Sequence, residues 1–279
     1  MPPKLSVIVP TADVDDRSIS LCLLSLTHQS AIRDAEVVIV DNSEGYRCAE
    51  LATAHSGLLD VSVVKSAKHG NRAAARNLGA RKARGQILVF VDDDVLLPRS
   101  ETLAVLVDLA GGREFVCGAR RYWTYHDCDR NRVKEEAIRG EFLYVLRRSF
   151  VPRQIDPVTG FLRLLDVSFL GHFGAVRRDL FWSVGGFDEG YEGWGREDCD
   201  LMYRLLVVAR LGFAQMPSRM PIIHLTHPGP RQENPRTERR FARLERRHGM
   251  HLRFSTLLGK REFEDPRILV PLWENADDP

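Results

Sequence analysis

Strands and helices alternate along the first hundred residues, and this order constrains the fold more than any other feature of the chain. Apolar runs typical of buried strands occupy residues 5–9, 36–40, 61–64 and 86–91. Helical stretches separate them at residues 18–29, 47–54 and 71–84. Ser18 is the expected N-cap of the first helix, and Gly85 is the expected stop of the last. The alternation predicts an α/β fold in which helices cover both faces of a mostly parallel sheet.

The second half of the chain is patterned less regularly. We expect helices at residues 99–110, 133–148, 178–184, 197–211 and 236–248. Strand-like runs lie at residues 115–121, 167–176, 213–216 and 221–224. Pro228, Gly229 and Pro230 interrupt the chain before the last helix. One α/β domain over residues 1–230 is therefore expected, followed by a basic helical extension over residues 231–279.

Composition excludes several classes of protein. With 44% apolar residues, 28% charged residues and a net charge of +2, the chain is ordinary for a globular protein, and its charge does not indicate a nucleic-acid partner. The five cysteines are scattered without a CxxC pair, so neither zinc nor a disulfide framework is expected. No apolar run is long enough to span a membrane, and the first strand begins too early for a signal peptide. We therefore expect a cytoplasmic protein.

Three consecutive aspartates, Asp92, Asp93 and Asp94, follow the fourth apolar run. In an open α/β sheet, ligands bind at the carboxyl ends of the strands. Crowded carboxylates repel one another and favour a bound cation. In an extended chain, Asp92 and Asp94 lie on the same side. A solvated acidic turn is the alternative interpretation.

Other residues are expected at the same edge of the sheet. Pro10 and Thr11 close the first strand, and Asp41 closes the second, where simple turn chemistry is the alternative. Arg72 and Arg76 lie early in the third helix, and arginine at a helix N-terminus suits a diphosphate. An exposed arginine-rich helix face is the alternative. Glycine at position 70 would let the backbone approach a ligand closely.

A second group of motifs lies in the C-terminal half. The segment GGFD at 185–188 is followed by GWGREDCD at 193–200. Glu197 and Asp198 begin a helix, where the macrodipole alone favours acidic residues, so helix chemistry does not separate a capping role from a catalytic one. His224 and His227 follow the last short strand.

Taken together, these motifs resemble those of inverting GT-A glycosyltransferases of the family-2 type. The C-terminal half is similar to the galactosyltransferase-type domain of β-1,4-galactosyltransferases and chondroitin polymerases. The family order of a D-x-D motif, a GGF…GWGxED segment and a late histidine is reproduced, as is NRAxxxNxG at 71–79. The resemblance runs from about Lys4 to about His227. It implies a GT-A fold with a nucleotide-binding half at 1–98 and an acceptor and catalytic half at 99–230.

The resemblance also implies a role for each candidate residue. Asp94 would ligate Mn²⁺, or Mg²⁺ as a substitute, with His227 slightly ahead of His224 as the imidazole ligand. Asp198 would be the general base, and Glu197 would bind the acceptor or donor sugar. Contacts to a nucleotide sugar, UDP-linked by family analogy, would come from Pro10, Thr11, Asp41, Arg72, Arg76, Asp92, Asp93, Trp194 and Gly195. Trp194 offers a flat face for a sugar, with a core tryptophan as the alternative. His172 and Phe173 stand where the family places small residues that line the donor sugar.

The expected activity is metal-dependent, inverting transfer of a sugar to a glycan, peptide or small-molecule acceptor. A sugar-nucleotide pyrophosphorylase is one alternative, but residues 10–13 lack its Gly-rich, Arg-containing signature. A non-catalytic nucleotide-sugar-binding protein is another, but it would be expected to have lost Asp94 or Asp198. Arginine-rich segments at 120–153 and 231–253 suit an anionic or glycan-bearing acceptor or peripheral membrane contact, with solvated helix faces as the alternative.

Overall fold

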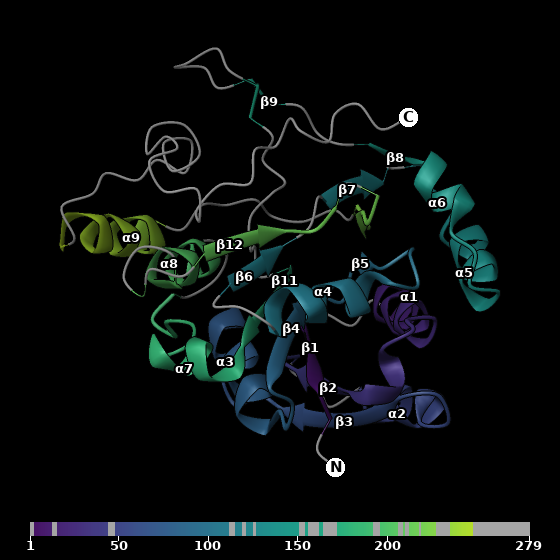
Figure 1. Ribbon diagram of the computed structural model, residues 1–279, viewed down its shortest axis with the longest axis horizontal. Helices are drawn as coiled ribbons and strands as arrows, with labels where there is room; N and C mark the ends of the chain where they lie inside the picture. The colour runs from purple at the N-terminus through teal and green to yellow at the C-terminus, as the bar shows by residue number, and fades with distance from the viewer. Residues whose placement is uncertain are drawn as a thin grey trace.

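The centre of the molecule is a seven-stranded sheet in the order β12-β6-β11-β4-β1-β2-β3 (Figure 1). The computed structural model describes residues 3–12, 16–43, 48–111, 115–118, 121–124, 127–150, 154–155, 162–163, 172–191, 196–205, 209, 212–217, 219–226 and 235–247. The strands are β1 (Leu5–Thr11), β2 (Ala35–Asp41), β3 (Asp60–Lys65), β4 (Ile87–Val91), β6 (Phe115–Gly118), β11 (Phe173–Arg177) and β12 (Gly212–Gln215). Strands β1 to β4 are parallel, and β11 runs antiparallel to β4 and β6. The predicted mostly parallel α/β fold is confirmed.

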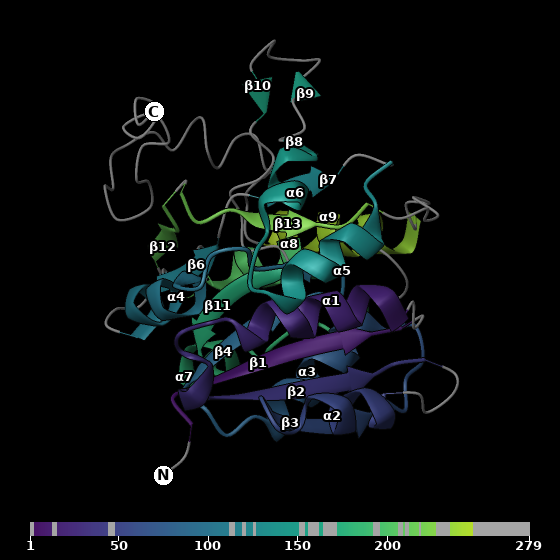
Figure 2. The ribbon, with the colours of Figure 1, turned by 90° about the vertical axis from the view of Figure 1, so that its right-hand side faces the viewer.

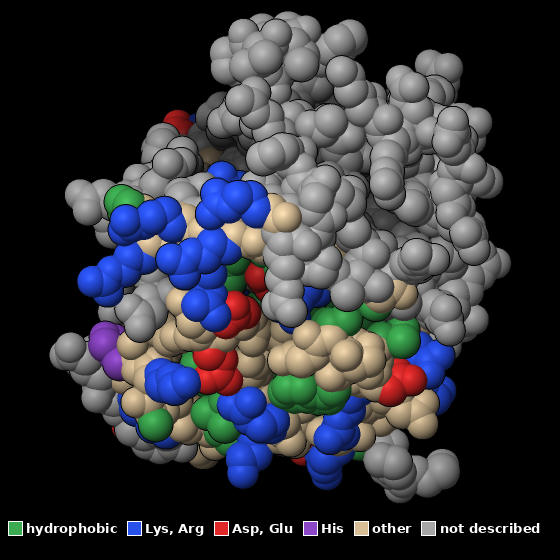
Figure 3. All heavy atoms as spheres, turned by 90° about the vertical axis from the view of Figure 1, so that its left-hand side faces the viewer, with side chains coloured by type: hydrophobic (Ala, Val, Ile, Leu, Met, Phe, Trp, Pro, Cys, Tyr) green, Lys and Arg blue, Asp and Glu red, His purple; other side chains and the backbone are tan. Residues whose placement is uncertain are grey.

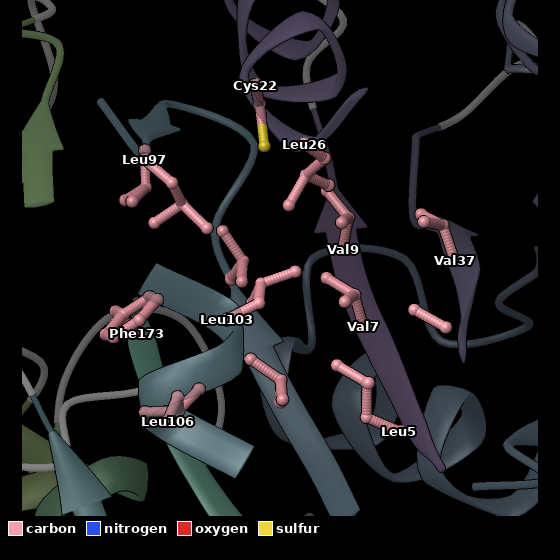
Figure 4. Close-up of a cluster of buried hydrophobic side chains, with 14 of the residues drawn as sticks. Leu5, Val7, Val9, Cys22, Leu26, Val37, Leu97, Leu103, Leu106 and Phe173 are labelled. Atoms are coloured by element: carbon pink, nitrogen blue, oxygen red, sulfur yellow. The ribbon is translucent and has the colours of Figure 1, made fainter. Parts of the chain in front are cut away.

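Helices cover both faces of this sheet because its buried strands alternate their side chains between two apolar clusters. On one face, Val7 and Val9 meet α1 (Asp16–Thr27) and α4 (Thr102–Gly111), as Figure 4 shows. On the other face, Ile8 packs with α3 (Arg72–Lys82), α7 (Arg178–Ser183) and α8 (Glu197–Tyr203). The remaining helices are η1 (Ile32–Asp34), α2 (Ala49–His55), α5 (Arg130–Ile138), α6 (Leu143–Arg147) and α9 (Pro235–Arg247).

Helix α3 lies unusually close to the sheet. A Cβ atom at Gly79 would stand 2.4 Å from Cγ2 of Ile8 and 2.9 Å from Cγ2 of Val40. Only glycine allows this approach without displacing the two side chains. The helix that carries Arg72 and Arg76 is therefore held directly against β1 and β2.

A second sheet has the order β5-β13-β7-β8. Its strands are β5 (Val95–Leu96), β13 (Ile222–His224), β7 (Arg121–Thr124) and β8 (Ser149–Phe150), and a further pair is formed by β9 (Gln154–Ile155) and β10 (Leu162–Arg163). Leu96 and Ile223 of this sheet pack with residues of α1, α5 and α6, and α1 lies between the large sheet and α5 (Figure 2). Because β5 directly follows the three aspartates, this sheet brings distant residues to them.

Four expected boundaries are wrong in detail. The expected strand at 115–121 is divided between two sheets, as β6 and β7, and the expected helix at 133–148 is divided into α5 and α6 near Gly140, whose φ is 71°. Ser18 is not an N-cap, because α1 begins at Asp16 and the Ser18 hydroxyl accepts a hydrogen bond from Arg130 at 2.6 Å. Helix α3 ends at Lys82 with Ala83 as its C-cap, and Gly85 instead allows close contact with the backbone of β1.

The expected strand at 167–176 and the expected helix at 197–211 extend into residues outside the described ranges, and their described parts are β11 and α8. Within the described ranges, no helix combines the length and the apolar character that a membrane crossing requires.

Candidate active site

The carboxyl ends of β1, β2 and β4 meet at one edge of the large sheet, as predicted. Thr11 pairs with Asp41 in the parallel register of β1 and β2, and Asp92 directly follows β4. The backbone N–H of Asp92 donates to the carbonyl of His172 at 2.9 Å. This edge therefore gathers the candidate nucleotide residues and the acidic triplet.

Arg76 joins this edge to the second group of motifs. Its side chain is 2% exposed, and Nη2 donates to Oδ1 of Asp92 at 2.8 Å while Nη1 donates to Oε1 of Glu197 at 3.0 Å. Burial opposes the charge of Arg76, but Asp92 and Glu197 outweigh it and raise the pKa of the guanidinium. The guanidinium therefore fixes the end of β4 relative to the start of α8.

The carboxylates around this bridge perturb one another. Burial raises the pKa of Asp93 to about 7, and the charge of Asp94 adds to the shift. Burial and the charge of Asp198 raise the pKa of Glu197, against the influence of Arg76. The charge of Arg72 opposes both shifts. An edge with this excess of crowded carboxylates favours a cation.

Pairing of β13 with β5 brings a histidine to the triplet. His224 is paired with Val95, and the N–H of Leu225 donates to the carbonyl of Asp94 at 2.8 Å. Nε2 of His224 consequently lies 3.4 Å from Oδ2 of Asp94. His227, which was predicted slightly ahead of His224 as a metal ligand, lies outside the described residues.

The donor atoms at this position suit a divalent metal. Within the described ranges, no three His, Cys, Asp or Glu side chains are grouped closely enough to hold a metal by themselves. Asp94 and His224 supply one oxygen and one nitrogen donor, a combination that suits Mn²⁺, and metals at phosphate sites commonly complete their coordination with substrate and water. The chemistry of these two side chains therefore fits such an ion.

Asp198 lies in the first turn of α8. Its carboxylate is half-buried, and Oδ1 accepts the N–H of Cys199 at 2.7 Å. Arg196, just before the helix, has a φ of 69°, in the left-handed region that non-glycine residues rarely adopt. Glu197 is buried at 5% exposure, so Asp198 is the more accessible of the two neighbouring carboxylates.

The structure describes some, but not all, of the other residues that are predicted to contact the nucleotide sugar. Asp41 is fully buried, and its Oδ1 accepts from the backbone N–H of Ser43 at 3.0 Å and from Nζ of Lys65 at 3.3 Å. Turn chemistry thus occupies this oxygen, and a contact with a nucleotide stays a prediction. Pro10 and Thr11 are buried at the same edge, whereas Trp194 and Gly195 lie outside the described residues.

Two asparagines of the NRAxxxNxG pattern hold the GGFD segment. Asn77 donates to the carbonyl of Phe187 at 2.8 Å and accepts its N–H at 2.9 Å. Asn71 caps α3 by accepting from Ala74, and it also donates to the carbonyl of Glu189 at 2.9 Å. Gly70 has a φ of 72°, a left-handed conformation that favours glycine, and close approach of its backbone to a ligand stays a prediction.

Sequence reasoning missed Lys65 and Glu189. Lys65 ends β3 beside Asp41, so the strand-end rule applied to the third strand would have found it. Glu189 pairs with Lys68 at 2.6 Å and with Arg81 at 3.4 Å, and no local pattern indicates contacts across more than a hundred residues.

Comparison with known proteins identifies the enzyme class. Residues 6–185 match the family described as Glycosyl transferase family 2. The chain belongs to this family. Residues 166–228 of the glycosyltransferase also match the N-terminal domain of galactosyltransferase. The predicted family and the predicted enzyme class are confirmed.

The glycosyltransferase has bacterial relatives of known activity. It is 31% identical over 230 residues to validoxylamine A glucosyltransferase of Streptomyces hygroscopicus subsp. jinggangensis, a match that covers 73% of this chain and 51% of the relative. It is 25% identical over 225 residues to chondroitin synthase of Escherichia coli, covering 72% of this chain and 32% of the relative. The chain thus spans about half of the first relative and about a third of the second.

Solved structures share the GT-A fold with this glycosyltransferase. GalNAc-T7 with UDP, GalNAc and Mn²⁺ is 16% identical with a TM-score of 0.62, covering 87% of this chain and 48% of that one. The Pyrobaculum calidifontis mannosyltransferase PcManGT with GDP-Man and Mn²⁺ is 21% identical with a TM-score of 0.54, covering 83% and 59%. S. aureus TarS with UDP-GlcNAc is 20% identical with a TM-score of 0.57, covering 81% and 60%.

Loss of the buried guanidinium is expected to damage both stability and transfer. Arg76→Met leaves Asp92 and Glu197 without their shared partner, and removal of one member of a buried ion pair costs about 3–5 kcal/mol of unfolding free energy. Arg76→Lys keeps the positive charge but not the planar guanidinium that bonds two carboxylates. Compared with Arg76→Met, it is expected to regain much of the unfolding free energy but less of kcat. Urea unfolding and steady-state kinetics measure the two effects.

Arg81→Met is the matched control, because Arg81 is an exposed arginine on the same helix. It is expected to change the unfolding free energy by less than about 1 kcal/mol. Equal losses in Arg76→Met and Arg81→Met would contradict the bridging role.

Proposed function

We propose that this glycosyltransferase moves a sugar from a UDP-linked donor to a hydroxyl of a glycan, peptide or small-molecule acceptor, with metal dependence and inversion. The observation that carries the proposal is the Arg76 bridge, which joins the acidic triplet to the start of α8. In this proposal, residues 1–98 form the nucleotide half, residues 99–230 form the acceptor half, and residues 231–279 form a basic extension.

The donor would bind along the edge of the sheet. Pro10, Thr11 and Asp41 would face the nucleoside, and Asp92 would contact the ribose. Arg72, at the start of α3, would bond the diphosphate together with the helix N-terminus. UDP is favoured because the similar structures of GalNAc-T7 and TarS are complexes with UDP or UDP-GlcNAc, although that of PcManGT is a complex with GDP-Man.

Asp94 and His224 would hold Mn²⁺, with His227 as a further proposed ligand. When bound, such an ion would offset the negative charge that develops on the departing nucleoside diphosphate. Asp93, between the metal ligand and the ribose contact, would also contact the nucleotide sugar.

The transfer would be a single displacement. Asp198 would take the proton of the acceptor hydroxyl. At the same time, the acceptor oxygen would form a bond to the anomeric carbon of the donor sugar, and the bond between that carbon and the diphosphate oxygen would break. Attack opposite the leaving group inverts the anomeric configuration. Glu197, held by Arg76, would bond a sugar hydroxyl, and Trp194 and Gly195 would cover the sugar from the preceding loop.

A donor screen tests this function before the acceptor is known. Incubation with UDP-Glc, UDP-GlcNAc, UDP-GalNAc and GDP-Man is expected to release UDP from one UDP sugar, with Mn²⁺ and not with excess EDTA. Release of nucleotide is followed by chromatography, and NMR of the first transfer product reports its anomeric configuration. Preference for GDP-Man would contradict the assignment of UDP. Activity in excess EDTA would contradict the metal dependence, and a product that retains the anomeric configuration of the donor would contradict the single displacement.

A further inference from the structure

Helix α9 presents a row of arginines on its exposed side. Its sequence contains six arginines and two glutamates. Spacings of three and four residues bring most of the arginines to one side of a helix, and five of them are exposed: Arg236, Arg239, Arg240, Arg243 and Arg246. Figure 3 looks onto this side of the molecule, where Lys and Arg side chains form a contiguous group at the upper left.

Two contacts anchor α9 to the protein, one through the buried Phe241 and one through Arg240 of the exposed row. Phe241 is buried at 4% exposure, and the guanidinium of Arg196 lies 5.3 Å from the centre of its ring. Arg240 pairs with Asp188 at 2.7 Å and lies over the ring of Tyr191. Since Arg196 directly precedes Glu197 and Asp198, α9 is packed on the segment that leads to the proposed acceptor site.

The arginines enclose a hollow of about 330 Å³, which is lined by Gly190, Arg236, Arg239, Arg240 and Arg243. This volume lies within the range of small-ligand sites. Arg240 is balanced by Asp188, and the described residues that line the hollow are four arginines and one glycine. Like charges at positions i and i+4, such as Arg239 and Arg243, destabilise a helix unless an anion neutralises them.

We propose that this hollow binds phosphate groups of the acceptor, an inference that rests on the proposed function. The planar guanidinium fork bonds phosphate oxygens in pairs, and a phosphate brings up to two negative charges to a hollow that four arginines line. Gly190 lines the hollow, whereas the donor diphosphate is assigned to Arg72 at the start of α3. Because Phe241 of α9 contacts Arg196, two residues before Asp198, an acceptor whose phosphates occupy the hollow would lie next to the residues that precede the proposed base.

A membrane surface fits these observations less well. A helix that lies on a bilayer buries an apolar face among the lipids. Here the aromatic residue of α9, Phe241, is buried against the protein under Arg196. The arginines also line a concavity, which suits a compact anionic group better than a flat sheet of headgroups.

Inorganic tripolyphosphate is the probe, titrated by calorimetry in EDTA so that no metal is shared. The double variant Arg239→Gln, Arg243→Gln is expected to bind it at least about tenfold more weakly than the wild type. The matched control Arg33→Gln, Lys82→Gln removes two exposed charges at the opposite edge of the sheet and is expected to bind like the wild type. UDP affinity with Mn²⁺ is expected to be the same in both double variants.

Three results would overturn the proposal. Equal weakening in both double variants would indicate a general charge effect. Loss of tripolyphosphate binding in Arg72→Gln alone would place the probe at the donor edge. Loss of binding to phosphatidylglycerol–phosphatidylcholine vesicles in the α9 variant, with tripolyphosphate binding unchanged, would assign the arginines to a membrane. A wild type that binds tripolyphosphate but releases no nucleotide in the donor screen would contradict the proposed function and support the anion site.

Discussion

Asp198→Asn is expected to retain donor binding and to lower the rate of transfer by about a hundredfold or more. Asparagine is nearly isosteric, and its Oδ1 can still accept the N–H of Cys199, so the first turn of α8 is preserved. Its amide cannot take a proton from the acceptor hydroxyl. The measurements are kcat with acceptor and the Kd of the nucleotide sugar.

Asp200→Asn is the control on the same helix. Asp200 is buried at 3% exposure and accepts hydrogen bonds from Arg204 at 2.6 Å and Tyr191 at 3.1 Å. Its replacement is expected to lower the unfolding temperature, with a smaller effect on kcat in the folded fraction. Unchanged transfer in Asp198→Asn would show that Asp198 only begins the helix.

Asp94→Ala is expected to abolish Mn²⁺-dependent binding of UDP and with it turnover. The carboxylate lies 3.4 Å from His224 and beside Asp92 and Asp93, so its loss removes a proposed ligand while relieving repulsion among the acidic groups. The fold is therefore expected to remain intact. Calorimetry of UDP with and without Mn²⁺ measures the loss, and thermal unfolding without metal checks the fold.

Asp108→Ala supplies the comparison for this variant, since Asp108 is an exposed aspartate on α4. It is expected to bind UDP and Mn²⁺ like the wild type. Full activity in Asp94→Ala, or undiminished wild-type activity in excess EDTA, would rule out the metal assignment.

Local sequence patterns predicted the large sheet but not the division into two sheets. Apolar runs ending in polar residues identify parallel strands and the edge at which they meet, because each strand carries its own signal. In the run at 115–121, the isolated Gly118 stands where β6 ends, but a single glycine does not by itself divide a strand. Its division is determined by the pairing of β7 with β13, a contact across about a hundred residues.

The sequence predicted which residues lie at the site better than it predicted the contacts between them. The strand-end rule and the family resemblance brought Asp92, Asp94 and Glu197 to one place. Arg76 was predicted to contact the donor, whereas the structure gives it two carboxylates, one of them 121 residues away. No sequence pattern indicates the pair of Arg76 and Glu197, because each residue is also typical of the helix in which it lies.

The close approach of α3 at Gly79 has a consequence for the chemistry as well as for packing. Arg76 lies three residues earlier on the same side of the helix, and its guanidinium spans a fixed gap to Asp92 and Glu197. The length of an arginine side chain is constant, so the clearance beneath the helix determines whether both carboxylates stay in reach. Gly79 has no functional group, yet it sets the distance between α3 and the sheet. That distance in turn determines where the guanidinium of Arg76 lies relative to Asp92 and Glu197.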